Sequence, residues 1–209
     1  MFEKPIVMLD FETTGLSPDM GSRITEVAAL RIVGDEIVDR FVSLVNCNVR
    51  IPADIIQLTG ITQAMVDAAP PANHVVPELI KFIGRDSLAA HNASFDAKFL
   101  QAEGARLRLV PDYEHLICSV KLSRRIFPGL PSYNLSALAK SLGIQFRGSA
   151  HRAEADAEVS ANLLLHIGRH MKNSIGIESI NAKLLNDITK VSAAKVPTFL
   201  KAQKEKCTA

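Results

Sequence analysis

The order of apolar runs in this sequence predicts an α/β domain with a mixed central sheet. Three strand-like runs come first, and the second and third are joined by Gly34-Asp35, a hairpin turn signal. Strand-like and helical patterns then alternate down to about residue 171. The hydrophobic content of 47% and charged content of 22% are ordinary for a globular protein of 209 residues. Together these features favour an antiparallel meander that is extended into a mixed sheet.

The first strand is predicted at residues 5–10, a short apolar run that ends at turn residues. The runs at residues 24–33 and 36–45 complete the meander. Two further extended segments are predicted at residues 87–92 and 111–117.

Helical spacing of apolar residues predicts the helices, with caps or stops at Gly60, Thr62, Pro70 and Gly143. In chain order the helices are expected at about residues 53–60, 63–69, 75–84, 93–105, 118–126, 135–142, 153–171 and 177–190. Residues 148–152 are expected to form a polar, mobile loop. The lysine-rich end that follows the last helix is expected to fray.

The charge distribution separates two regions, with a boundary near residue 172. Residues 172–209 contain seven lysines and three acidic residues, a net charge of +4, which leaves −2 for residues 1–171. We therefore expect a catalytic domain at 1–171 and a basic helical extension at 172–209. No apolar run reaches 18 residues, no secretory pattern is present and the three cysteines are scattered, so we expect a cytoplasmic protein without a membrane span.

The first strand ends in two carboxylates that are separated by one residue. Asp10 and Glu12 should point to the same face because strand side chains alternate, and Phe11 should point to the other. Two unit charges about 4 Å apart repel by roughly 4 kcal/mol at an effective dielectric near 20. A proton, a basic partner or a metal ion must offset this repulsion, unless both acids are simply solvated at the strand end.

Two further stretches place acidic and imidazole side chains near helix starts. Residues 91–96 (HNASFD) run from a strand into a helix and place Asp96 in its first turns, and His151 precedes Asp156 by five residues. Asp156 lies on the apolar face of its helix, where an acid is rarely left without a partner or a metal. Taken singly, Asp96 could complement the helix macrodipole and Asp156 could pair with Arg152. Four carboxylates gathered in one site would instead suit Mg²⁺ or Mn²⁺.

In this order and spacing, residues 10–15 (DFETTG), residues 91–96 and the pair His151 and Asp156 resemble the three motifs of the DEDDh 3′–5′ exonucleases. This DnaQ-like family includes the proofreading epsilon subunit of bacterial DNA polymerase III. The resemblance covers about residues 5–171 and implies a ribonuclease H-like fold, a five-stranded mixed sheet flanked by helices. The extension contains no glutamine-plus-hydrophobic clamp-binding motif, so a stand-alone relative is the alternative to an epsilon subunit.

The resemblance implies phosphodiester hydrolysis assisted by two Mg²⁺ or Mn²⁺ ions. It assigns Asp10 to both ions, Glu12 and Asp156 to the first ion, and Asp96 to the surroundings of the second. It makes His151 the group that accepts the proton of the attacking water. The expected product is a nucleoside 5′-monophosphate released from a 3′ end.

The resemblance also implies contacts with the last nucleotides of a substrate. These contacts are expected from Thr13, Thr14, Gly15, Leu16, Leu58, Thr59, Asn92, Phe95 and His151. For Leu16, Leu58 and Phe95, a place in the hydrophobic core is the alternative. Aromatic residues make up only 5% of the chain, so a long run of stacked bases is not expected and the footprint should be short.

Three hypotheses for function follow. The leading one is a metal-dependent 3′–5′ exonuclease that acts on single-stranded or frayed DNA 3′ ends in proofreading or repair. The second keeps the chemistry and changes the substrate to RNA 3′ ends. The third is a polymerase-associated interaction module, in which the extension binds a DNA polymerase subunit. Packing of the extension onto the domain, through Leu184, Leu185, Ile188 and Val191, is the favoured alternative to that last role.

Overall fold

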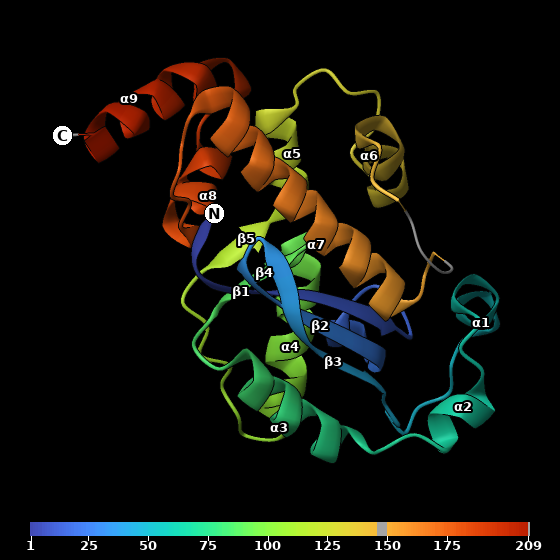
Figure 1. The fold of residues 1–209 in the computed structure, drawn as a ribbon. Helices are drawn as coiled ribbons and strands as arrows, with labels where there is room; N and C mark the ends of the chain where they lie inside the picture. Colours follow the sequence, from blue (N-terminus) through green and yellow to red (C-terminus); the bar gives the residue numbers. More distant parts are fainter. Residues whose placement is uncertain (146–149, 209) are drawn as a thin grey trace.

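A five-stranded sheet forms the centre of the computed structural model, which describes residues 1–145 and 150–208. The strand order is β3-β2-β1-β4-β5, and β1 pairs antiparallel with β2 and parallel with β4 (Figure 1). The strands are β1 (Phe2–Thr13), β2 (Ile24–Gly34), β3 (Glu36–Leu44), β4 (Ser87–Ala90) and β5 (Leu116–Cys118). This arrangement confirms the predicted meander and the mixed sheet.

The helices flank the sheet and follow the predicted order. Within the described residues they are α1 (Ala53–Thr59), α2 (Gln63–Asp67), α3 (Ala72–Ile83), α4 (Ala93–Arg106), α5 (Ser119–Ile126), α6 (Leu135–Leu142), α7 (Ala153–His170), α8 (Ala182–Lys190) and α9 (Val196–Thr208). A π-helical turn, Met171–Ile175, continues α7. None of the helices in residues 1–145 and 150–208 combines the length and the apolar character needed to cross a membrane.

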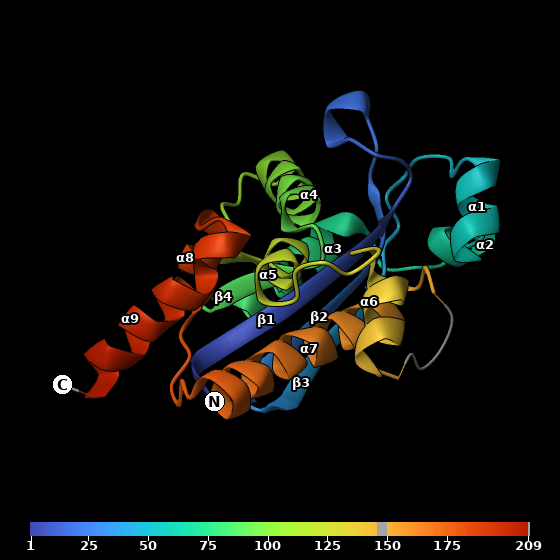
Figure 2. The same cartoon turned by 90° about the horizontal axis from the view of Figure 1, so that it is seen from above.

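Strand β1 lies between two apolar layers because its side chains alternate between the faces of the sheet. Ile6 and Met8 belong to the layer built with α7, whereas Val7 and Leu9 belong to the layer built with α3 and α4. Figure 2 shows α7 running along one side of β1 and β2, with α3 and α4 on the other side. In β1, even-numbered side chains therefore face α7, and odd-numbered side chains face α3 and α4.

The observed ends of several elements differ from the predicted ones. Strand β1 is longer than residues 5–10, and Thr13, predicted to leave the strand in a turn, still pairs with Ile24 after a register shift that follows Glu12. Residues 111–117 were expected to contain an extended segment, and β5 begins within this range at Leu116. Residues 148 and 149 of the predicted loop 148–152 lie outside the described residues.

The extension folds onto the domain, and two predictions about it are wrong. Helix α8 begins at Ala182 and not at residue 177, because the Asn181 side chain accepts a hydrogen bond from the Leu184 amide (2.9 Å) and caps the helix there. The end that was expected to fray forms α9, which buries Val196 and Leu200. The sequence shows only isolated apolar residues among lysines in this region. It therefore gave no sign that the domain offers an apolar surface on which this helix packs.

The favoured packing of the extension is confirmed. Leu185 and Ile188 are fully buried in the layer that contains Ile6 and Met8 of β1, and Leu184 and Val191 pack partly buried against it. The backbone joins as well, because the Ile180 amide donates to the Met1 carbonyl oxygen and the Glu3 amide donates to the Ile180 carbonyl oxygen (3.0 Å each).

Truncating Leu185 to Ala should lower the free energy of unfolding by roughly 2–5 kcal/mol, because the change leaves a cavity in the layer under β1. Urea unfolding followed by circular dichroism measures this. Val110→Ala is the control, since Val110 is 86% exposed and its truncation should change stability by less than about 0.5 kcal/mol. Equal effects of the two substitutions would contradict the packing described for the extension.

Candidate active site

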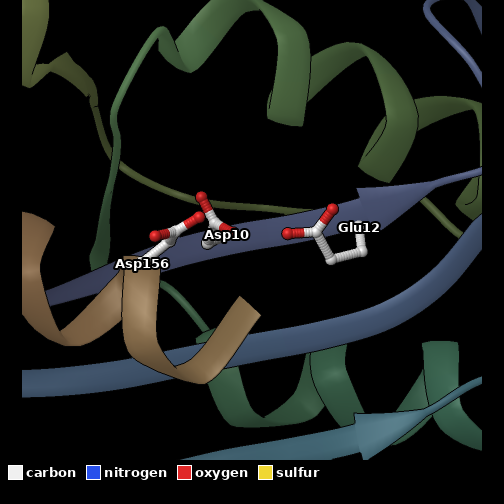
Figure 3. Close-up of side chains that lie close together, drawn as sticks. All are labelled: Asp10, Glu12 and Asp156. Carbon is white, nitrogen blue, oxygen red and sulfur yellow. The ribbon is translucent and has the colours of Figure 1, made fainter. Parts of the chain in front are cut away.

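Three segments that are distant in the sequence meet at one edge of the sheet. They are the carboxyl end of β1, the start of α4 after the parallel strand β4, and the start of α7. Asp10 and Glu12 come from β1, and Asp156 comes from α7 (Figure 3). Each contributes one carboxylate oxygen to a group in which all the oxygens lie within 4.8 Å of one another. The predicted shared face of Asp10 and Glu12 is therefore the face covered by α7.

Asp96 lies in the same cleft but outside this group of three carboxylates. It is only 3% exposed, at the start of α4, and its charge is among the groups that act on Asp10. The backbone amides of Asp96 and Phe11 donate hydrogen bonds to its carboxylate. The structure therefore brings together all four predicted acids, with Asp96 beside the other three.

The four acids hold protons more tightly than isolated carboxylates do. Burial, followed by the charges of Asp96 and Asp156, raises the pKa of Asp10 well above its ordinary value. Burial and the Asp156 charge raise the pKa of Glu12 to about 8, and burial raises that of Asp96 to about 7. Burial also raises the pKa of Asp156. The site therefore has an excess of negative charge that the surrounding protein only partly compensates.

The donor set fits a hard divalent cation. The ligand atoms of the group are carboxylate oxygens from Asp10, Glu12 and Asp156, the donors that Mg²⁺ and Mn²⁺ prefer. Basic side chains lower the pKa of two of these three acids: Arg152 acts on Glu12, and His151 acts on Asp156. In both cases burial raises the pKa by more than the basic side chain lowers it. Positive charge supplied by bound ions would offset the repulsion that protons offset otherwise.

His151 lies at the mouth of this cleft, immediately before α7. Its side chain is exposed and its backbone has a φ of 63°, in the left-handed region that few residues other than glycine adopt. The His151 amide donates a hydrogen bond to Oδ2 of Asp156 (3.1 Å). The strained turn thus joins the histidine backbone directly to a metal-ligand candidate.

Glu26 of β2 was missed by the sequence analysis. It is 3% exposed and lies beside Glu12 in the β1–β2 register. Arg152, considered above as a partner for Asp156, instead pairs with Glu26 (Nη2 to Oε1, 2.6 Å). A lone acid within the apolar run 24–33 was the only signal for this residue, and strand alternation alone does not identify its partner.

His91 has a structural role between two loops. Its Nε2–H donates to the Tyr133 carbonyl oxygen (3.1 Å), and its Nδ1 is hydrogen-bonded to the Ser119 hydroxyl (2.9 Å), which also contacts the Ala90 carbonyl oxygen (3.3 Å). Burial lowers the pKa of this imidazole to about 4, which is consistent with neutrality. His91 lines the cleft, but both of its ring nitrogens are already used.

The cleft above the carboxylates has a volume of about 270 Å³. Most of the predicted substrate contacts line it: Thr13, Gly15, Leu16, Leu58, Thr59, Phe95 and His151. Thr14 and Asn92 are not among its lining residues. The Thr14 hydroxyl instead accepts a hydrogen bond from the Arg23 amide (2.9 Å), and Asn92 precedes α4 with a φ of 77°. Ile55 of α1 also lines the cleft and was not predicted.

The alternative of a core position is excluded for two of the three apolar candidates. Leu16 is 86% exposed and Leu58 is 51% exposed, so both sit at the rim of the cleft. Phe95 lines the cleft and also packs on Phe99 of the core, with ring centroids 4.9 Å apart. Both leucine side chains are therefore accessible to a molecule that enters the cleft.

Comparison with known proteins extends these observations. A family model described as exonuclease matches residues 7–164. The chain is 32% identical over 177 residues to the DNA polymerase III subunit epsilon of Aquifex aeolicus, covering 85% of this chain and 87% of that protein. It is 34% identical over 202 residues to the PolC-type DNA polymerase III of Clostridium perfringens, covering 94% of this chain but only 13% of that protein. This chain thus spans a small part of that relative's length.

A solved structure of exonuclease X in complex with 5′ overhanging duplex DNA is similar in fold. The TM-score is 0.66 with 30% sequence identity, covering 88% of this chain and 99% of that one. The likeness confirms the predicted ribonuclease H-like fold.

The raised pKa values predict how the stability of the metal-free protein depends on pH. Glu12 and Asp96, with pKa values of about 8 and about 7, keep protons in the folded state that the unfolded chain has already released, since the ordinary values are 4.5 and 3.8. The stabilisation is therefore present at low pH and is lost as pH rises through the folded pKa values. Between pH 6 and 9 in EDTA, the free energy of unfolding should fall by roughly 4 kcal/mol.

Urea titrations at several pH values, with EDTA or with Mn²⁺, measure this dependence. Added Mn²⁺ should flatten it, and Asp10→Asn, which removes one charge, should weaken it in EDTA. A metal-free stability that stays constant or rises from pH 6 to 9 would contradict the electrostatic description of the site.

Proposed function

The chain belongs to the DEDDh 3′–5′ exonuclease family, and from its site we propose that it hydrolyses single-stranded or frayed DNA from the 3′ end with the help of two divalent ions, Mg²⁺ or Mn²⁺. The single observation that carries the proposal is the gathering of Asp10, Glu12 and Asp156 within 4.8 Å at the end of β1, with Asp96 beside them. A role in proofreading or repair is proposed with it, because one relative is named as a polymerase III subunit.

Each acid has a defined place in the proposed reaction. Asp10 lies between Glu12 and Asp156 in the group, and these three carboxylates would hold the divalent ions (Figure 3). Asp96, held by two backbone amides, would orient the surroundings of the second ion. The ions would supply positive charge to the scissile phosphate and make water more acidic.

His151 is the proposed general base. Its exposed imidazole lies at the cleft that also contains the carboxylates, and its backbone is already fixed to Asp156. An imidazole nitrogen would take the proton from water as the water oxygen attacks the last phosphodiester phosphorus. The bond from phosphorus to the 3′ oxygen of the preceding nucleotide then breaks, which yields a nucleoside 5′-monophosphate and a strand with a new 3′-hydroxyl.

The cleft suits a short stretch of nucleic acid. Its volume of about 270 Å³ is at the lower end for ligand sites. Leu16 and Leu58 at the rim would contact the terminal base, Thr13, Gly15 and Thr59 would lie along the sugar, and Phe95 would stack on the next nucleotide. A Cβ at Gly15 would lie 2.7 Å from Ser22 Oγ, so the Gly15 backbone packs closely against Ser22. We keep Thr14 and Asn92 as supports of the two loops that carry these contacts.

A DNA polymerase subunit is the proposed protein partner, supported by the names of the relatives. Removing residues 172–209 is not a clean test, because the extension buries Leu185 and Ile188 in the core. Binding of a purified polymerase subunit to the full chain, measured with and without substitutions at exposed Lys183 and Lys201, is the better experiment.

Asp10→Asn should reduce nuclease activity by about 10³-fold or more, equivalent to about 4 kcal/mol of transition-state stabilisation, because Asp10 is central to the group of carboxylates. Initial rates are measured with Mg²⁺ and Mn²⁺ on matched single-stranded, mismatched duplex and RNA 3′ ends. Asp112→Asn, at an exposed position, is the control. Full activity of Asp10→Asn or in EDTA would overturn the proposal, and faster cleavage of RNA would favour an exoribonuclease instead.

His151→Asn should lower kcat by roughly 10²–10⁴-fold and leave Mn²⁺ affinity nearly unchanged. Asparagine tolerates the left-handed backbone at this position, and the backbone amide that bonds to Asp156 is retained. In His151→Gly, free imidazole added to the assay should restore part of the rate. An unchanged kcat in His151→Asn would exclude His151 as the base.

A further inference from the structure

We propose that Glu26 is a positioning residue of this site, which holds the first turn of α7 so that Asp156 faces Asp10 and Glu12. The inference rests on the proposed function. The contacts that support it are made by Glu26, Arg152 and Ala153, which are not among the four acids described above. Glu26 comes from β2, and its carboxylate is almost completely buried, with 4% of its side chain exposed.

Among residues 1–145 and 150–208, Glu26 makes four hydrogen bonds, all to the start of α7. Arg152 Nε donates to both carboxylate oxygens (3.2 and 3.1 Å), and Nη2 donates to Oε1 (2.6 Å). The Ala153 amide donates to Oε2 (2.9 Å). The single carboxylate thus fixes two consecutive residues at the point where the helix begins.

The Ala153 contact replaces a missing helix cap. The first amides of a helix have no partner within the helix, and a side chain at the N-cap usually accepts from one of them. The N-cap of α7 is Arg152, which has no acceptor and makes no such bond. Glu26 supplies the acceptor from the neighbouring strand, and its charge complements the positive end of the helix.

Asp156 follows this anchored point by one helical turn. Its amide donates to the Arg152 carbonyl oxygen (3.0 Å), and its carboxylate accepts from the His151 amide (3.1 Å). A displacement of residues 152 and 153 would therefore move both Asp156 and the proposed base. Because Glu12 lies opposite Glu26 in the β1–β2 register, the same strand pair positions the acids of β1 and the anchor of α7.

A second ion pair in the same turn provides an internal comparison. Arg40 of β3 bonds to Glu154 (2.7 Å), but both side chains are about half exposed, 52% and 45%. Exposed pairs of this kind contribute little to structure. Glu154→Gln is therefore the matched control for Glu26→Gln, since each removes one Arg–Glu pair at the start of α7.

The test is Mn²⁺ binding to the full chain without nucleic acid, measured by calorimetry and by electron paramagnetic resonance of free Mn²⁺. Glu26→Gln should weaken Mn²⁺ binding by about tenfold or more, the usual range for groups that orient metal ligands. Glu154→Gln should bind as the unmodified chain does. Adding Arg152→Gln to Glu26→Gln should not weaken binding further, because the guanidinium holds the start of α7 through its bonds to Glu26 and its positive charge, which also acts on Glu12, disfavours a bound cation.

A merely structural role is tested with the other buried pair, Arg23 and Glu103 (2.6 Å, Glu103 3% exposed). Glu103→Gln should lower the melting temperature as Glu26→Gln does but keep Mn²⁺ affinity. Equal Mn²⁺ affinity in Glu26→Gln and the unmodified chain, or a further loss in the double variant, would overturn the proposal. Failure of the unmodified chain to cleave any nucleic acid while Mn²⁺ binding follows this pattern would overturn the proposed function alone.

Discussion

Repulsion among carboxylates at one edge of the sheet is the constraint that organises the rest of this structure. Asp10 and Glu12 are brought together by strand periodicity, and packing of α7 adds Asp156 to the same small volume. Burial removes the water that would otherwise screen these charges, so it raises the pKa values of Asp10 and Asp156 and, with the Asp156 charge, that of Glu12 to about 8. The backbone offsets only part of the repulsion, through amides that donate to Asp96 and Asp156. Cations can offset the remainder, and this links the metal requirement to how the chain folds.

The features that follow from periodicity could be predicted from the sequence. A period of two places Asp10 and Glu12 on one face, and the apolar stripe of α7 places Asp156 toward the sheet. The meeting of all three motifs at one site was implied by the family resemblance. The partner of Arg152 could not be predicted, because it depends on the register between β1 and β2 and on where α7 crosses them. Helix α9 was missed for a similar reason, since the surface that orders it is made by segments far away in the sequence.

Exposure separates ligand-facing residues from core residues where sequence pattern cannot. Leu16 and Leu58 look like core candidates in the sequence, yet both are exposed beside the cleft, while Phe95 serves the core and the cleft together. Thr14 was expected to contact substrate but does not line the cleft. Its hydroxyl instead accepts a hydrogen bond from the Arg23 amide and supports the loop. The hydroxyls of Thr13 and Thr14 are chemically alike, and only the path of the backbone after the register shift at the end of β1 gives them different surroundings.

The backbone contacts between residues 1–3 and Ile180 have a consequence for how such a domain can be combined with others. These contacts bring the beginning of β1 beside Ile180, in the segment that leads into α8. A polypeptide that entered the domain at β1 would therefore do so beside this segment, at the end of β1 opposite Asp10 and Glu12. The geometry is compatible with a relative in which the matching segment makes up 13% of the chain. A junction at that end of β1 would leave the carboxylates at its other end in place.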